Sequence, residues 1–145
     1  MRWWIVLLVI VLAGCGASRP APQTASGAAV SSSPVVGPQW RLTLIGTDER
    51  WRGERPAYIE LIPENGHLRL VGSDGCNRLS GTAMLGEGRR IDIRGLASTR
   101  RACAGTPQAA EVGAMLSRAY RYLIDHNLLV LFGPDSRVLG GFQRQ

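Results

Sequence analysis

The chain has 145 residues, of which 45% are hydrophobic and 19% are charged. This composition is typical of one globular domain of ordinary size, and it excludes a wholly disordered or fibrous chain. The formal net charge of +6 comes from arginine, because the sequence contains no lysine, and it favours contact with anionic surfaces.

The start of the chain has the pattern of a bacterial lipoprotein signal peptide. Arg2 supplies a positive charge, and residues 3–13 form an unbroken apolar run. At about 1.5 Å per residue this run is too short to cross a hydrocarbon core of roughly 30 Å as a helix. It ends in Leu-Ala-Gly-Cys15, which resembles the lipobox. We expect residues 1–14 to be removed and Cys15 to carry the diacylglyceryl and palmitate lipid. The alternative is an ordinary signal peptide followed by a chance cysteine.

Residues 15–38 are expected to form the lipidated cysteine and a flexible linker. The segment is rich in Ala, Ser, Pro and Gly, with Arg19 as its only charge and no apolar periodicity. As a coil it would extend on the order of 26 Å. Gly16 after the cysteine, in place of aspartate, is typical of outer-membrane sorting. The sequence therefore predicts an envelope protein that faces the periplasm from the outer membrane, for which nucleic acid is not an expected partner.

The folded domain is predicted to span residues 39–145, and its first half is a series of strands. Asn65-Gly66 predicts a tight hairpin, and Gly81 predicts a bulge or a close backbone approach. The strands expected in this half are residues 40–45, 57–62, 67–71, 79–85 and 90–93.

One helix is predicted over residues 107–124, with Thr106 as its N-cap and Pro107 in its first turn. Its expected apolar face consists of Val112, Leu116, Ala119, Tyr120 and Leu123. Two further strands are expected at residues 128–132 and 138–142.

Four motifs together resemble the META domain of HslJ-like heat-shock lipoproteins. The motifs are Trp40-x-Leu42, Gly75-Cys76-Asn77-Arg78, Thr99-Arg100-Arg101-Ala102-Cys103, and Leu129-x-Leu131 with residues 139–142. The resemblance covers residues 39–143. It implies an α+β fold in which a curved antiparallel sheet of about seven strands wraps around one main helix. It also implies a role in stress response or envelope maintenance, and it brings no catalytic residues. The family usually has methionine at the position of Arg101.

Cys76 and Cys103 are an even pair once Cys15 is lipidated, and a disulfide between them is expected in an exported chain. In the chain-entropy description it would be worth roughly 3–4 kcal/mol. Free thiols or a metal site are the alternatives. A metal would need two more ligands, and His67 and His126 lack the spacing of a metal site. We expect neither a metal nor a cofactor.

The polar motif residues are interpreted mainly as structural, as are Trp40 and Gly75. Asn77 is expected to hold its own backbone in an Asx-type turn, with a ligand-binding amide as the alternative. Thr99 and Arg100 are expected to bind backbone carbonyls and carboxylates within the fold. The alternative for Arg100 is that its planar guanidinium group binds an anionic ligand.

Five arginines form the only concentrated charge in the sequence. They form either a solvated face or a weak site for anionic lipid headgroups. They are Arg89, Arg90, Arg94, Arg100 and Arg101.

Three functions remain open for the domain, which is expected to be monomeric. The favoured one is a non-catalytic module that binds envelope proteins or anionic lipid, because the sequence has no phosphate loop, HExxH or GxSxG motif. The alternatives are a carrier of an apolar or acyl ligand and a hydrolase of an envelope polymer. A large apolar cavity would favour the carrier, and a buried histidine beside a carboxylate would favour the hydrolase.

Overall fold

The computed structural model of the chain describes residues 32–145. The predicted signal peptide and the lipidation of Cys15 lie outside these residues and stay predictions. The elements are β1 (Gln39–Ile45), β2 (Glu49–Arg50), β3 (Ala57–Glu64), β4 (His67–Asp74), β5 (Arg78–Gly86), the short 3-10 helix η1 (Glu87–Arg89), β6 (Arg90–Ser98), α2 (Ala109–Ser117), β7 (Arg121–Asp125), β8 (Leu128–Phe132) and β9 (Val138–Arg144).

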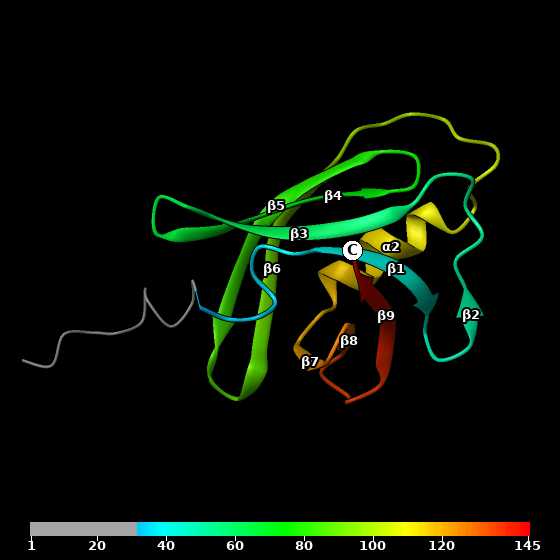
Figure 1. Cartoon of the computed structure of the whole chain (residues 1–145). Helices are drawn as coiled ribbons and strands as arrows, with labels where there is room; N and C mark the ends of the chain where they lie inside the picture. Colours follow the sequence, from blue (N-terminus) through cyan, green and yellow to red (C-terminus); the bar gives the residue numbers. More distant parts are fainter. Residues whose placement is uncertain (1–31) are drawn as a thin grey trace, which may run out of the picture.

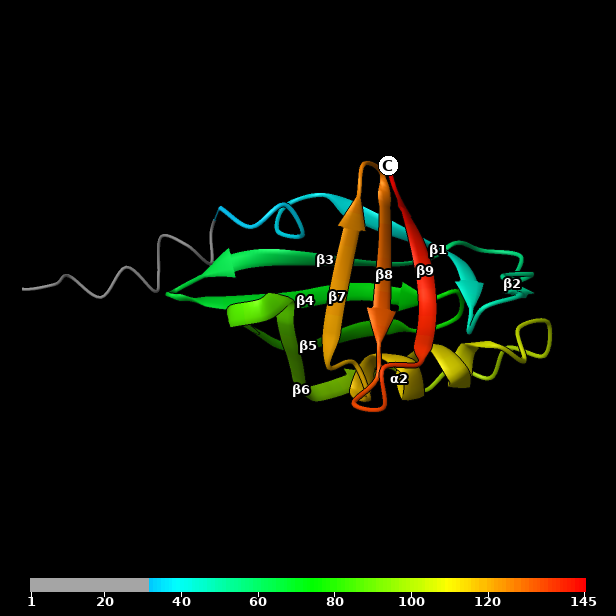
Figure 2. The ribbon, with the colours of Figure 1, turned by 90° about the horizontal axis from the view of Figure 1, so that it is seen from below.

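The strands form one antiparallel sheet in the order β2-β1-β3-β4-β5-β6-β7-β8-β9, and β1 also pairs with β9, so the sheet curves back on itself (Figure 1). The seam between β6 and β7 is weak, with one pair, Arg90 and Arg121. Helix α2 contacts β4 and β6 and lies near the ends of β7, β8 and β9 (Figure 2). The predicted α+β fold is confirmed, with nine strands in place of about seven.

The interior of the sheet is filled by apolar side chains. Alternation along β3 turns Ala57, Ile59 and Leu61 inward, as the period of a half-buried strand requires. Trp40 and Phe142 are the largest fully buried side chains. Large side chains of this kind pack the core of the sheet.

Two local predictions are confirmed. Asn65 and Gly66 have φ of 49° and 80°, and they form the two-residue turn between paired Glu64 and His67. The ladder between β5 and β6 shifts register at Gly81, where an added Cβ would lie 3.1 Å from the carbonyl oxygen of Arg94.

The predicted helix is too long at both ends. Helix α2 begins at Ala109, and its N-cap is Gln108 in place of the predicted Thr106, without a side-chain capping bond. Helix α2 ends at Ser117, and Arg121–Asp125 form β7, which pairs along its whole length with β8. Tyr122 is buried, whereas Leu123 is 40% exposed, so this segment has the period of a strand. Pairing with β8 satisfies backbone groups that a longer helix would have satisfied within itself, and tertiary contacts therefore overrode the helical pattern.

The packed domain also begins earlier than residue 39. Val35 is fully buried, and its carbonyl oxygen accepts a hydrogen bond of 3.0 Å from the indole N–H of buried Trp40. Val36 bridges to Leu61, and the hydroxyls of Ser33 and Tyr122 lie 2.9 Å apart. Residues 33–38 therefore belong to the fold. Within the part of the chain that the structure describes, no helix has the length and apolarity needed to span a membrane.

Candidate functional site

The site is built on the turn between β4 and β5, and Asp74 organises this turn. Asp74 is 5% exposed, and its Oδ1 accepts hydrogen bonds from the backbone N–H groups of Cys76 (2.8 Å) and Asn77 (2.5 Å). Gly75 has φ of +87°, a conformation that favours glycine. Asp74 was not among the predicted site residues, although an aspartate directly before glycine is a signal for an Asx-type turn.

Asn77 has a different role from the predicted one. Its Oδ1 accepts hydrogen bonds from the backbone N–H of Arg101 (2.7 Å) and the hydroxyl of Thr99 (3.2 Å). The Thr99 hydroxyl oxygen in turn accepts the backbone N–H of Arg78 at 3.1 Å. Asn77 and Thr99 therefore tie the turn to the segment after β6, and the local Asx bonds belong to Asp74.

The predicted disulfide joins the same two segments. Cys76 and Cys103 are bonded, with their Cα atoms 5.9 Å apart. Cys76 lies in the turn and Cys103 in the segment that leads from β6 to α2. A covalent bond and the hydrogen bonds of Asn77 thus hold the Thr99–Cys103 segment against the turn.

Trp51 packs against the turn, and it was not among the predicted site residues. Its indole N–H donates to the carbonyl oxygen of Arg55 at 3.0 Å. A Cβ on either Gly53 or Gly75 would collide with its ring. Gly75 is therefore required both by its backbone angle and by the close approach of this indole.

Gln108 anchors the start of α2 and was also missed. It is 7% exposed, and its amide nitrogen donates to Glu49 Oε1 (2.6 Å) and to the carbonyl oxygen of Arg50 (3.1 Å). Its Oε1 accepts the backbone N–H of Arg52 at 2.9 Å. This fully bonded amide fixes the helix start relative to β2.

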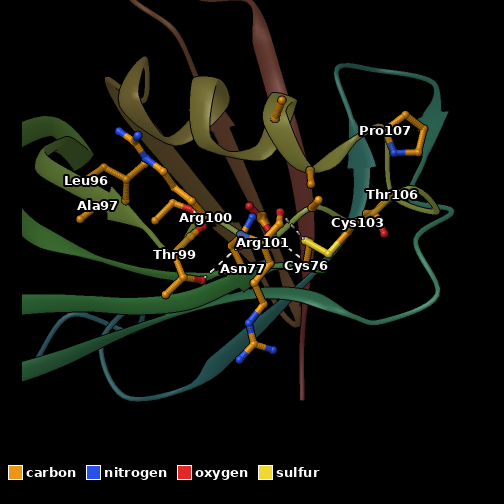
Figure 3. A pocket seen from close by; sticks show the side chains of 15 residues that line it. Cys76, Asn77, Leu96, Ala97, Thr99, Arg100, Arg101, Cys103, Thr106 and Pro107 are labelled. Carbon is orange, nitrogen blue, oxygen red and sulfur yellow. Dashed lines mark hydrogen bonds between the residues drawn. A yellow bond between two sulfur atoms is a disulfide. The ribbon is translucent and has the colours of Figure 1, made fainter.

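An open cleft of about 830 Å³ lies between the Thr99–Cys103 segment and the start of α2 (Figure 3). We call it the disulfide cleft. Its lining combines the motif residues with small or apolar side chains. The latter are Leu96, Ala97, Ala102, Pro107, Ala109 and Ala110.

The structure does not gather the five predicted arginines into one patch. Arg90 lies at the start of β6, where its guanidinium stacks 3.9 Å from the ring centroid of Tyr120. Arg94 pairs with Asp92 at 2.6 Å. Arg89 lies in the hairpin before β6, whereas Arg100 and Arg101 follow the C-terminal end of β6. At the rise per residue of an extended strand, the two ends of β6 are roughly 25 Å apart.

Arg100 and Arg101 leave the backbone on opposite sides (Figure 3). Both are exposed. Arg100 forms no hydrogen bond or ion pair within residues 32–145, so the expected contacts to carbonyls and carboxylates are not present there.

Neither of the two histidines is buried. His67 is exposed. His126 Nδ1 lies 2.6 Å from Asp125 Oδ1, but its side chain is 93% exposed. Asp125, His126 and Thr43 line one surface hollow. The Thr43 hydroxyl donates a hydrogen bond to the carbonyl oxygen of Gly141. Within residues 32–145, no group of three potential metal ligands is found.

Comparison with known proteins identifies the fold. The family model of the META domain matches residues 33–145. A protein from Burkholderia xenovorans, solved by NMR, is 22% identical, with a TM-score of 0.61 over 94% of this chain and 99% of its own. A DUF4847 family protein from Bacteroides vulgatus is 17% identical, with a TM-score of 0.55 over 79% of this chain and 96% of its own. These two likenesses show the fold alone. No curated protein shows significant similarity to the chain.

Proposed function

The chain belongs to the META domain family, and from this premise we propose that it is an envelope lipoprotein anchored through Cys15 whose domain acts by binding. We place it at the outer membrane, facing the periplasm, in stress response or membrane maintenance. The Cys76–Cys103 disulfide supports export, because disulfides persist in oxidising compartments outside the cytosol.

The partner that suits the disulfide cleft best is an extended segment of another envelope protein. Heat would expose such segments by partly unfolding envelope proteins. The observation that carries this proposal is the free edge of β6. Leu96, Ala97 and Ser98 line the cleft, and beyond Arg90 no strand within residues 32–145 pairs with this edge of β6. An unpaired edge accepts an added strand through backbone hydrogen bonds, and a neighbouring apolar hollow takes alternate side chains.

Site-specific photo-crosslinking in intact cells tests the proposal. A photoreactive residue at Ala110, which is exposed and lines the cleft, is expected to capture envelope proteins, with more adducts after heating. The matched control is Ala114, one turn further along α2, exposed and outside the lining. Equal capture at both positions, or capture of lipid alone at Ala110, would refute binding of protein segments in the cleft.

Complementation of a deletion strain tests the anchor and the absence of catalysis. Survival of heat or of membrane-crossing drugs is expected to fall with Cys15→Ala and with Ala110→Trp, and to persist with Ala114→Trp. The double variant His67→Ala/His126→Ala is expected to complement fully. Its failure, in a folded protein at normal level, would point to histidine chemistry and against a pure binding role.

A further inference from the structure

A second hollow, of about 470 Å³, adjoins the disulfide cleft and has a different character. Three arginines from separate parts of the chain line it, together with Tyr58 and Ser73. Arg55 follows β2, Arg78 begins β5, and Arg101 follows β6. We call this hollow the arginine pocket.

The backbone of each arginine is held in place by a contact described above. The carbonyl oxygen of Arg55 accepts the Trp51 indole N–H at 3.0 Å. The N–H of Arg78 donates to the Thr99 hydroxyl at 3.1 Å, and the N–H of Arg101 donates to Asn77 at 2.7 Å. The backbone positions from which the three arginines line the pocket are therefore fixed by the fold.

Within residues 32–145 the three guanidinium groups have no carboxylate partner. The arginines that pair within residues 32–145 are Arg69, Arg94 and Arg137, each with an acid close in sequence. No aspartate or glutamate lines the arginine pocket. Like charges gathered in one hollow repel one another, and a bound anion would offset that repulsion.

Neutral donors complete the pocket. Tyr58, Ser73 and Arg78 are direct cross-strand neighbours on β3, β4 and β5, so their side chains stand side by side on the outer face of the sheet. Ser73 Oγ accepts the backbone N–H of Gly75 at 3.1 Å, which leaves its hydroxyl proton available. Three guanidinium groups together with hydroxyl donors can bind a tetrahedral dianion better than they can bind a single carboxylate.

We propose that the arginine pocket binds a phosphate group. An adjoining groove of about 510 Å³ shares Tyr58, Arg78 and Thr99 with the pocket and adds Val71 and Ala97. This groove has room for the remainder of a phosphorylated molecule, such as the headgroup of an anionic lipid. The same chemistry also serves free phosphate. The site goes beyond the proposed capture of protein segments and does not depend on it.

Calorimetric titration of the full-length protein in neutral detergent tests the proposal, with inorganic phosphate, glycerol 3-phosphate and acetate as probes. Saturable binding of a phosphate probe is expected. Arg55→Gln, Arg78→Gln and Arg101→Gln should each weaken it about tenfold, the loss of one charged hydrogen bond. Tyr58→Phe should weaken it less. These arginine side chains are exposed, so thermal melting should show that the variants stay folded.

The matched control is Arg118→Gln, which removes the same charge from an exposed position just beyond α2 and outside the pocket. It should bind as the wild type does. Tighter binding of glycerol 3-phosphate would assign the site to a headgroup, and equal or tighter binding of inorganic phosphate would assign it to the free ion. Absence of saturable binding, equal binding of acetate, or equal weakening by Arg118→Gln would each overturn the proposal. None of these results bears on crosslinking at Ala110.

Discussion

Around Trp40 the side chains are apolar and fully enclosed, whereas around Asp74 and Asn77 they are polar and partly open to solvent. Trp40, Leu42 and Phe142 are at most 2% exposed and are held by packing. The turn at Asp74 is held by hydrogen bonds and by one disulfide, one half of which, Cys103, is exposed to solvent. Packing of the interior therefore sets most of the stability. The turn at Asp74–Asn77 and the Thr99–Cys103 segment, which we call the rim, set the positions of the site residues with a smaller contribution to stability.

The largest effect is expected from the interior. Trp40→Ala removes a fully buried indole and leaves the carbonyl oxygen of Val35 without its donor. The free energy of unfolding should fall by about 3–5 kcal/mol, measured by denaturant titration. Leu128→Ala, at a side chain that is 43% exposed, should change it by less than about 0.5 kcal/mol. Similar losses in both variants would contradict the dominant contribution of the enclosed interior to the free energy of unfolding.

Removal of the disulfide should rank next. Cys76→Ser/Cys103→Ser, or reduction of the wild type, should lower the free energy of unfolding by about 3 kcal/mol, because the unfolded chain loses a constraint. The interior should survive, so the near-ultraviolet circular dichroism of the folded domain, to which the buried Trp40 contributes, should largely persist. Loss of that signal under native conditions would mean that the rim also holds the interior together.

Asp74→Ala should cost about 1–3 kcal/mol, because two backbone N–H groups at a buried position lose their acceptor. Asp74→Asn keeps an acceptor oxygen and should cost less. Asp135 is the matched control, since it accepts the backbone N–H of Arg137 in a turn where its side chain is 46% exposed. If Asp74→Ala and Asp135→Ala lower the free energy of unfolding equally, burial of the Asp74 turn makes no contribution to stability.

The smallest effect on stability is expected from Asn77→Ala, at about 1 kcal/mol for two partly exposed hydrogen bonds. The sharper readout is local: hydrogen exchange at the amide of Arg101 should accelerate, while exchange at interior strand amides stays slow. Asn77→Asp keeps the acceptor and should preserve the protection of Arg101. Unchanged exchange in Asn77→Ala would remove the proposed tie between the turn and the Thr99–Cys103 segment.

Much of the fold followed from local patterns in the sequence. Residues 57–62 were predicted to form a strand, and the Asn65-Gly66 pair predicted its hairpin. Gly81 marked the register shift opposite Arg94. These features depend on side-chain period and on backbone angles that few residues adopt, so single residues carry them.

The segment after α2 could not be assigned in this way. The apolar residues of Arg121–Asp125 fit a helical face as well as a strand, and pairing with β8, which lies later in the chain, decided between the two. Val35 was likewise assigned to the linker, because only the buried indole of Trp40 makes its carbonyl oxygen a required acceptor.

In the site, the cysteine pair and the turn glycine could be predicted from the sequence alone. Tertiary structure decided the partners of Asn77 and the dispersal of the five predicted arginines along β6. It also brought together Arg55, Arg78 and Arg101, which belong to no common sequence motif. The reason is physical: an extended strand separates residues that are close in sequence, whereas strand register and a disulfide unite residues that are far apart.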